Sequence, residues 1–345
     1  MKVALIGLPG SGKTTLFNAL ADKSVDAHPG VPGAPPHVSV LPVHDERLDW
    51  LSDLFRPKKH TPATLIVEDH AGIPEGSARL DRRGELFSRM RSADGLVIVA
   101  NAFGGDAAEE LELVALELLS ADLAICERRL GKLDQEWKKL KERDRVLRER
   151  AAIEHVAQAI REGRCAHGLA VRSEDEPFLK GFQLFVRKPV MLFANVTAET
   201  EVPDLDSAAL DVRHRFSARV RLEAELATLA AEERELFAAE FGIEVPLRER
   251  FARACYRGLG LLSFFTVGDD EVRAWTLREG QDALAAADEV HTDLGRGFIR
   301  AEVTAFEDLR ALGSMREVKA KGKQRLEGRE YPVQDGEILN IRFST

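Results

Sequence analysis

The sequence predicts an α/β fold in which a parallel sheet is interrupted by an antiparallel helical coiled-coil hairpin and followed by a small C-terminal α+β domain. Three observations predict it. Nearly continuous apolar runs alternate with helix-like segments over the first two hundred residues. Residues 119–185 break that alternation with a heptad-like pattern, and short alternating segments begin near residue 261. The expected domains are the parallel-sheet domain (1–118 with 186–260), the helical hairpin (119–185) and the C-terminal α+β domain (261–345).

The parallel sheet is predicted from runs that are rich in β-branched residues and too apolar to leave one face in water. These runs are "KVALIG" (2–7), "ATLIVED" (63–69), "GLVIVANAF" (95–103) and "PVMLFANV" (189–196). Helix-like segments such as "KTTLFNALADK" (13–23) and "GELFSRMRSAD" (84–94) lie between them. Right-handed crossovers would bring the carboxyl ends of the strands to one edge, where such sheets bind ligands.

The first strand runs into "GLPGSGKT", Gly7 to Thr14, which matches the phosphate-binding pattern G-x-x-x-x-G-K-[ST] between a strand and a helix. Glycines let main-chain N–H groups face phosphates, and the following helix adds its dipole. Lys13 is expected to reach the β- and γ-phosphates, and Thr14 to bind Mg²⁺. The predicted nucleotide-binding residues of this loop are Gly7, Pro9, Gly10, Ser11, Gly12, Lys13, Thr14 and Thr15.

The second run ends in Asp69-His70-Ala71-Gly72, where the acid on the metal side of a P-loop NTPase belongs. Asp69 is therefore a predicted Mg²⁺ ligand with Thr14, and Lys13, Asp69 and Gly72 are the predicted catalytic residues. The alternative is that Asp69 only caps the following turn. Ile73 cannot orient or deprotonate water, and His70 would replace that function only in a reactive orientation.

The fourth run ends in Asn195 and Val196, where the motif Asn-Lys-x-Asp would contact a guanine base. Ala198 stands at the aspartate position, so the main discrimination against adenine is missing, and Glu199 comes one place late. Asn195 as a simple turn residue is the alternative. "FSARV" (216–220) offers Ser217 and Ala218 as a last base-contacting loop.

The hairpin is predicted from apolar positions a and d of a heptad, with "IEHVAQAIREGR" on the return arm. The heptad residues are Leu123, Cys126, Leu130, Leu133, Trp137, Leu140, Leu147 and Ala151. The charged segment "KKLKERDRVLRER" is either a solvated face or a partner-binding arm.

The C-terminal segment alternates short apolar strands with Gly-Asp or Asp-Gly turns, and a helical piece lies among them. Five clustered basic residues in this segment either form a patch that contacts RNA or belong to a solvated loop. They are Lys319, Lys321, Lys323, Arg325 and Arg329.

The composition bounds the remaining possibilities. A net charge of −9 argues against a protein that binds nucleic acid over its whole surface. No recognition of DNA sequence is expected. No stretch is apolar enough to span a membrane, and no signal peptide is expected. Three cysteines, Cys126, Cys165 and Cys255, cannot make a disulfide framework. These features predict a cytoplasmic protein.

Taken together, "GLPGSGKTTLFNAL", "VEDHAGI", "KPVMLFANV", "FSARVRLEAELATL" and the C-terminal "GLLSFFTVGDDEVRAWTL" with "YPVQDGEILNIRF" resemble YchF, the Obg-like ATPase family of translation-factor class P-loop GTPases. The resemblance runs along nearly the whole chain. It implies a G-domain interrupted by a helical hairpin and closed by a TGS domain of β-grasp fold. It also implies binding of ATP or GTP, slow hydrolysis, and association with the ribosome or its RNA.

The chain departs from the family pattern at four places. Gly33 lies near the position of a switch threonine that closes on Mg²⁺, and Pro32 replaces a redox-linked cysteine. Ala198 takes the place of the glutamate in the family's N-x-x-E. The loop "NAFGGDAAEE" (101–110) carries no histidine, although a histidine-bearing loop normally follows this strand. A hydrophobic residue at 73 is, in contrast, the norm of the family.

Three functions follow from these observations. The first is a slow ATPase/GTPase switch that uses ATP or GTP with Mg²⁺, with K⁺ as a further candidate cofactor. The second is a catalytically silent nucleotide-binding adaptor whose hairpin and TGS domain are the working surfaces. The third is a P-loop kinase, against which stand the D-x-x-G strand end and the Asn195 loop.

Overall fold

The computed structural model of this chain describes residues 1–21, 35–73, 80–136, 143–163, 165, 169–197, 203–207 and 209–344, without the side chains of 80–83, 136 and 231. The chain forms two units. The first unit consists of Lys2–Val40 and Ile66–Gly258. The second unit consists of Met1, Leu41–Leu65 and Leu259–Thr345. None of the described helices has the length and apolar character needed to cross a membrane.

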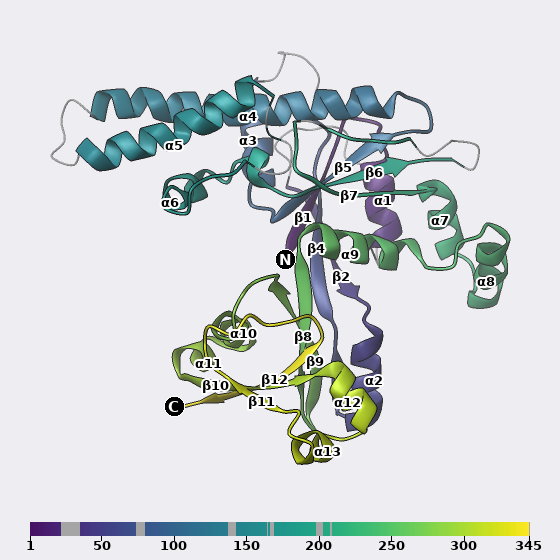
Figure 1. Ribbon diagram of the computed structural model, residues 1–345. Helices are drawn as coiled ribbons and strands as arrows, with labels where there is room; N and C mark the ends of the chain where they lie inside the picture. The colour runs from purple at the N-terminus through teal and green to yellow at the C-terminus, as the bar shows by residue number, and fades with distance from the viewer. Residues whose placement is uncertain are drawn as a thin grey trace. The chain divides into compact units, whose positions relative to one another are not determined.

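Six strands form the first sheet, in the order β2-β4-β1-β5-β6-β7 (Figure 1). Strand β1 pairs in parallel with β4 and β5, and β6 pairs in parallel with β5 and β7. The bounds are β1 Lys2–Ile6, β2 His37–Val43, β4 Ala63–Asp69, β5 Gly95–Asn101, β6 Val190–Asn195 and β7 Val212–Ala218. The four predicted strands are confirmed, and β2 and β7 complete the sheet.

The central strands are buried on both faces, as their apolar sequences predict. Every residue of β6 is buried, and only Asn101 of β5 is not. Helices α3 (Leu80–Met90) and α4 (Ala107–Glu136) contribute to the apolar core of one face. Helix α1 (Lys13–Leu20) packs with α7 (Val220–Ala227) and α9 (Leu247–Gly258), and Phe251 of α9 meets Phe216 of β7 edge to face.

The register brings the carboxyl ends of the strands to one edge of the sheet. Leu5 of β1 lies opposite Asp69 of β4, and Asn195 of β6 lies between Asn101 and Ala218. Residues that are far apart in the sequence therefore gather where the loop after β1 begins, which is the edge at which open α/β sheets bind ligands.

Helices α4 and α5 (Arg143–Arg161) form the predicted antiparallel hairpin (Figure 1). Ion pairs Arg129–Glu149 and Glu127–Arg161, with N–O distances of 2.7 and 2.9 Å, join the two helices. The predicted heptad holds in α4, where Cys126 and Leu133 are buried, but it is wrong in α5. Leu147 is 46% exposed and Ala151 is also exposed, while Val146, Ile153 and Val156 are buried.

The physical reason for this error is that α4 ends at Glu136 and α5 begins at Arg143. A heptad register describes one continuous helix, so counting it across two helices assigns the second helix the wrong face. Trp137 and Leu140 of the predicted heptad lie outside the described residues.

A buried ion pair lies at the root of the hairpin. Arg91, directly after α3, donates from Nη1 to Asp122 Oδ1 of α4 at 2.6 Å and to the carbonyl of Gln183 at 3.2 Å. Asp122 Oδ2 accepts the main-chain N–H of Val186 at 2.9 Å, and the guanidinium lies 4.1 Å from the ring centroid of Phe185. Asp122 thus fixes α3, α4 and the returning chain together.

The chain returns from the hairpin through three short helical turns. These are α6 (Glu176–Leu179), η1 (Lys180–Phe182) and η2 (Phe185–Arg187). Leu179, Leu184 and Val186 of this stretch join the apolar core between α4 and α5.

The second unit is built on a sheet in the order β11-β10-β12-β8-β9-β3. Strands β8 (Leu261–Val267) and β9 (Glu271–Arg278) form an antiparallel hairpin, and β10 (Phe298–Ala305) pairs antiparallel with β11 (Arg325–Glu327) and β12 (Glu337–Phe343). Its helices are α10 (Ala283–Val290), α11 (Thr292–Arg296), α12 (Phe306–Leu312) and α13 (Met315–Ala320). A C-terminal domain of mixed helices and strands is thereby confirmed.

The second unit also takes in a segment that the sequence patterns did not single out. Helix α2 (Glu46–Phe55) packs Trp50 edge to face on Phe306, with ring centroids 5.3 Å apart. Strand β3 (Lys59–Thr61) pairs in parallel with β9, and Thr61 Oγ1 donates to Glu271 at 2.6 Å. The domain boundaries expected from the sequence, 1–118 with 186–260, 119–185 and 261–345, remain a prediction.

Candidate functional site

The loop between β1 and α1 turns on glycines whose backbone angles other residues rarely adopt. Gly7, Gly10 and Gly12 have φ values of 151°, 87° and 90°. A Cβ atom at Gly7 would lie 2.5 Å from the carbonyl oxygen of Val99, and one at Gly12 would lie 2.2 Å from Nδ2 of Asn195. The loop therefore has both the conformation and the close packing that a main-chain phosphate cradle requires.

Lys13, the first residue of α1, turns its ammonium group back over this loop. Its Nζ atom donates to the carbonyl of Leu8 at 2.6 Å and to Ser11 Oγ at 3.3 Å. Burial lowers the pKa of Lys13 to about 8, against the attraction of Asp69 and Glu110. A polyphosphate in the loop would add negative charge beside an ammonium group that now has little solvent around it.

Thr14 and Asp69 are brought together as the sequence predicted. Thr14 Oγ1 donates to Asp69 Oδ2 at 2.9 Å, although 55 residues separate the two in the chain. Asp69 is fully buried at the end of β4. A hydroxyl and a carboxylate at this spacing are oxygen ligands of the kind Mg²⁺ prefers, so these residues fit a magnesium ion that also contacts bound phosphates.

The segment after Asp69 lies directly against the phosphate-binding loop. A Cβ atom at Gly72 would lie 2.8 Å from the main-chain nitrogen of Pro9. The N–H of Ile73 donates to the carbonyl of Gly7 at 3.0 Å, and the Ile73 side chain is fully buried in the core with Leu86. Gly72 thus allows the close approach, and Ile73 holds the segment in the core.

Two histidines lie close to this segment. His70 is buried and pairs through Nε2 with Glu68 at 3.2 Å, which does not favour a role as the base that activates water. His37, at the start of β2, places Nδ1 3.8 Å from Asp69 Oδ2. No sequence pattern points to His37, because it comes from β2 at the edge of the sheet, 32 residues before Asp69 in the chain.

The predicted base-contacting residues also meet at one place. Asn195 is buried and donates from Nδ2 to the carbonyl of Ser11 at 3.3 Å, which ties the end of β6 to the phosphate-binding loop. The N–H of Val196 donates to the carbonyl of Ala218 at 3.1 Å, so Val196 and Ala218 adjoin. Of the other predicted loop residues, Pro9, Gly10 and Thr15 are exposed and Ser11 is buried.

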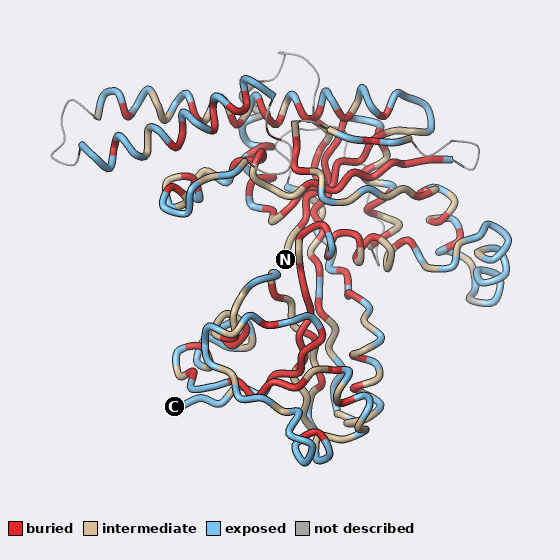
Figure 2. The backbone as a smooth tube through the Cα atoms, in the orientation of Figure 1, coloured by how far each residue is buried: buried red, intermediate tan, exposed pale blue. Residues whose placement is uncertain are grey.

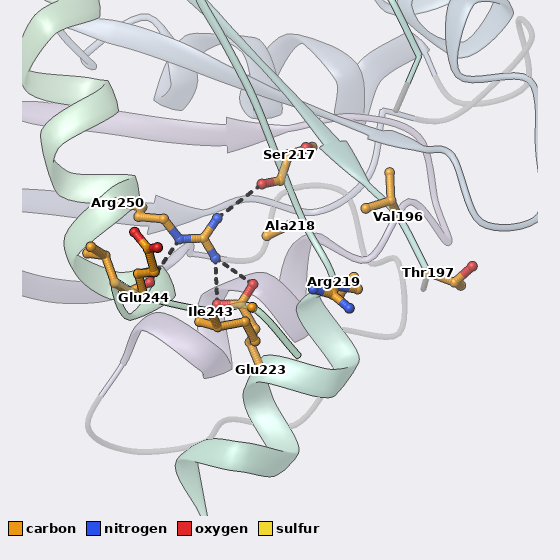
Figure 3. A pocket seen from close by; sticks show the side chains of 11 residues that line it. Val196, Thr197, Ser217, Ala218, Arg219, Glu223, Ile243, Glu244 and Arg250 are labelled. Atoms are coloured by element: carbon orange, nitrogen blue, oxygen red, sulfur yellow. Dashed lines mark hydrogen bonds and ion pairs between the residues drawn. The ribbon is translucent and has the colours of Figure 1, made fainter. Parts of the chain in front are cut away.

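A cavity of about 470 Å³ opens beside these residues (Figure 3). Arg250 of α9 and Glu223 of α7 form part of its wall, together with the loop 242–245. Both carboxylate oxygens of Glu223 accept from Arg250 Nη2, at 2.5 and 2.6 Å, and Arg250 Nη1 donates to the carbonyl of Ser217 at 3.4 Å. The other lining residues are Val196, Thr197, Ser217, Ala218 and Arg219.

Sequence reasoning missed the Glu223–Arg250 pair and two residues beside the phosphate-binding loop. Glu110 of α4 accepts the N–H of Asn101 at 2.9 Å and is one of the two carboxylates that raise the pKa of Lys13. Phe103 is 46% exposed, and its ring lies 3.9 Å from where a Cβ of Gly12 would be. Glu223 lies in the segment 216–229 and Phe103 and Glu110 lie in the loop 101–110, but no pattern in these segments points to the contacts of these side chains, so only the fold reveals them.

Several expectations fall where the structure gives no description. Gly33 and Pro32 of the first switch, and Ala198 and Glu199 after β6, lie outside the described residues, so the changes expected there stay predictions. The five basic residues predicted as one stretch, 319–329, are all exposed. Two of them have acidic partners: Lys323 lies 3.2 Å from Asp308, and Arg325 lies 2.6 Å from Glu337.

Comparisons with known proteins agree with this geometry. Residues 2–129 match the family model of the 50S ribosome-binding GTPase, and residues 261–344 match the model of the C-terminal YchF GTPase region, described as a protein of unknown function. The chain is 34% identical to the ribosome-binding ATPase YchF of Bacillus subtilis, over 100% of this chain and 99% of the relative. It is 31% identical to Obg-like ATPase 1 of Oryza sativa, over 100% and 92%.

A solved structure resembles the whole chain. The YchF GTPase of Schizosaccharomyces pombe superimposes with a TM-score of 0.81 at 25% sequence identity. The match covers 99% of this chain and 97% of the Schizosaccharomyces pombe chain. The phosphate-binding sheet, the helical hairpin and the C-terminal sheet domain therefore occur together in a known architecture.

Proposed function

The chain belongs to the YchF family of P-loop NTPases, and from this premise we propose that it is a slow ATPase or GTPase that binds its triphosphate with Mg²⁺ and associates with the ribosome. In this proposal Lys13, Asp69 and Gly72 act on the phosphates, and the loop from Gly7 to Thr15 holds them. Asn195, Val196, Ser217 and Ala218 contact the base.

One observation carries the proposal: Thr14 and Asp69 meet at 2.9 Å beside the buried ammonium group of Lys13. A bound Mg²⁺ would supply positive charge that offsets the negative charge of the phosphates. Thr14 and Asp69 would hold that ion, and Lys13 would place its positive charge on the β- and γ-phosphates. Gly72, which lies against Pro9 of the phosphate-binding loop, would offer its main-chain N–H to the terminal phosphate.

Slow turnover is proposed because the side chains at the positions that could orient water are engaged elsewhere. The Ile73 side chain is in the core, and His70 is paired with Glu68. Phosphoryl transfer depends mostly on positioning and charge stabilisation, so the remaining groups support hydrolysis at a reduced rate without losing the nucleotide.

The choice between ATP and GTP is proposed to be weak. Ala198 stands where an aspartate would accept from guanine. Of the carboxylates in the described cavity wall, Glu223 is paired with Arg250, while Glu244 is exposed on the loop 242–245. Adenine is therefore tolerated. K⁺ stays a candidate cofactor, which replacement of K⁺ by Na⁺ in the hydrolysis assay would test.

A titration tests nucleotide binding directly. Non-hydrolysable analogues of ATP and GTP are titrated calorimetrically into the protein with Mg²⁺, and Lys13→Ala serves as the control that loses most of the binding. Both analogues should bind, with affinities within about tenfold of each other. Absence of binding for both would overturn the proposal.

Single-turnover hydrolysis separates the switch from the silent adaptor. Triphosphate that is bound and then converted to diphosphate, even slowly, supports the enzyme. Triphosphate that stays intact with Mg²⁺, K⁺ and ribosomes would favour the adaptor, in which the hairpin and the C-terminal TGS domain are the working surfaces. A P-loop kinase is the least favoured function because Asp69–Gly72 and Asn195 follow the GTPase pattern.

Association with the ribosome or its RNA is proposed from the names of the relatives and from the exposed basic stretch. The triple variant with glutamine at Lys319, Lys321 and Arg329 should bind ribosomes less tightly and with a flatter dependence on salt. Arg296→Gln, an exposed basic residue outside the stretch, is the control. Unchanged binding and salt dependence would remove this stretch from the contact.

A further inference from the structure

Helix α8 (Ala231–Glu240) has an unusual surface for a helix of a folded unit. None of its residues whose side chains are described is buried, and Figure 2 colours almost the whole helix as exposed. Leu236 is 69% exposed and Phe237 39%, and Phe241 at the end of the helix is 37% exposed. These side chains follow at positions i, i+1 and i+5, which places them on one side of the helix.

Such a helix gains little from the rest of the chain. An isolated helix of this length is marginal in water, because most helical stability in proteins comes from burying an apolar face. Its N-cap residue Ala230 makes no side-chain hydrogen bond to the helix. The exposed leucine and phenylalanines therefore offer apolar area that only a binding partner could remove from water.

The far end of α8 is nevertheless fixed. Arg219 Nη2 donates to the carbonyl of Phe241 at 2.6 Å, and its guanidinium lies 6.0 Å from the centroid of the Phe241 ring. A cation at the C-terminal carbonyls is favourable for the helix dipole. Arg219 follows Ala218 directly and lines the cavity, so α8 is held in place from the end of β7.

The charges around the apolar residues indicate what kind of partner fits. Between 231 and 244 the chain has five acidic residues and one basic residue. All five carboxylates are on exposed residues, and Glu233 and Glu240 fall on the same side of the helix as Leu236 and Phe237. The acidic residues are Glu232, Glu233, Glu235, Glu240 and Glu244.

We propose that α8 with Phe241 is a docking surface for a basic amphipathic polypeptide segment, whose apolar side chains cover Leu236, Phe237 and Phe241 and whose lysines or arginines pair with the surrounding glutamates. RNA does not fit, because its phosphates would meet five carboxylates. The docking requires neither nucleotide nor hydrolysis, so it stands or falls separately from the function proposed above.

Fluorescence anisotropy with the full-length protein tests the surface. The probe is a labelled synthetic peptide in which leucine and lysine recur with the helical period, so that leucines line one face. The Leu236→Ser/Phe237→Ser variant should weaken binding by at least about tenfold. Glu233→Gln/Glu240→Gln should weaken it several-fold and reduce its salt dependence. Leu116→Ser, an equally exposed leucine on α4, should leave binding unchanged.

Four results would overturn the proposal. The first is equal binding by wild type and the Leu236→Ser/Phe237→Ser variant. The second is equal binding of a scrambled peptide whose leucines and lysines are not segregated, since this would indicate unspecific charge attraction. The third is displacement of the peptide by poly-uridine. The fourth is a wild-type dimer in sedimentation velocity that the same double variant dissociates, since the surface would then serve a second copy of this chain. Circular dichroism and nucleotide affinity check that each variant is folded.

Discussion

The phosphate end and the base end of the candidate site differ in how closely their atoms pack. At the phosphate end, an added methyl group at Gly7, Gly12 or Gly72 would collide with main-chain or buried side-chain atoms. At the base end, a cavity of about 470 Å³ is lined by an ion pair, several carbonyl groups and the loop 242–245. The phosphate end is therefore tightly packed, whereas the base end is an open cavity with few polar groups that could contact a base.

This difference indicates which part of a nucleotide the chain selects. A close-fitting cradle with a fixed ammonium group demands a polyphosphate, because small displacements there remove several charge-assisted hydrogen bonds together. An open cavity whose buried carboxylate, Glu223, is already paired with Arg250 gives little discrimination between purines. Changes at the phosphate end should therefore cost affinity, and changes at the base end should cost mainly stability.

Gly12→Ala should have the largest effect. The new Cβ would meet Asn195 Nδ2 at 2.2 Å, and a φ of 90° is strained for alanine. The two penalties together reach about 3 kcal/mol, which corresponds to about a hundredfold loss of triphosphate affinity by calorimetry. Gly104→Ala is the matched control, since a Cβ there meets nothing within 4 Å. Wild-type affinity for Gly12→Ala would contradict a close-fitting cradle.

The affinity should also fall when the pH rises above about 8. Burial lowers the pKa of Lys13 to about 8 in the free protein, and bound phosphates must raise it, so binding takes up a proton above that pH. We expect a loss approaching tenfold per pH unit between about pH 8 and 9.5, measured by calorimetry in buffers of different ionisation heat. Lys13→Arg, which stays charged, should bind more weakly but without this slope. A flat wild-type profile would show that Lys13 is already protonated there.

Glu223→Gln should act on stability more than on affinity. Arg250 would lose its bidentate partner, whose side chain is only 6% exposed, and the free energy of unfolding should fall by about 2 kcal/mol. Triphosphate affinity should change by less than about threefold. Arg221→Ala breaks the exposed pair with Glu225 and should cost only about 0.3 kcal/mol in the same denaturant experiment. A large shift in ATP over GTP preference for Glu223→Gln would instead make this carboxylate a reader of the base.

Ile73→Gln should have the smallest effect on hydrolysis. The side chain at this position is fully buried in the core, so an amide placed there has no path to water at the phosphates. We expect the single-turnover rate to stay within about twofold, while stability falls by about 2 kcal/mol because a polar group is buried. Ile73→Val should lose less stability at the same rate. A tenfold faster turnover of Ile73→Gln would mean that the segment leaves the core during the reaction.

The phosphate end could be predicted because its determinants are local or follow from the order of strands. The spacing of residues from Gly7 to Thr14 is by itself enough to predict the phosphate-binding loop. Asp69 ends a strand beside β1, so a parallel sheet must bring it to the start of α1. The four apolar runs became strands at nearly the predicted bounds for the same reason: buried strands are recognised by composition.

The remaining features could not be predicted because they depend on contacts between distant residues. No sequence pattern points to the contacts of His37, Glu110 or the Glu223–Arg250 pair, because each is placed by the packing of a different helix or strand. The coiled-coil register was right in α4 and wrong in α5, since a period cannot be counted across the end of a helix. The exposed face of α8 was missed because a short stretch with leucine and phenylalanine looks, from sequence, like any core-facing helix.

The Arg91–Asp122 pair has a consequence for anyone who wishes to shorten this protein. A deletion that removes residues 119–185 and joins the flanking segments would discard Asp122 with the hairpin. It would leave a guanidinium stranded in an apolar interior, and the trimmed chain would be expected to lose several kcal/mol of stability for a cause unrelated to the hairpin's own role. A deletion that keeps Asp122 and the segment Gln183–Val186 and replaces the outer part of the hairpin with a short turn would preserve this ion pair. The role of the hairpin's tip could then be tested without losing the contacts at its base.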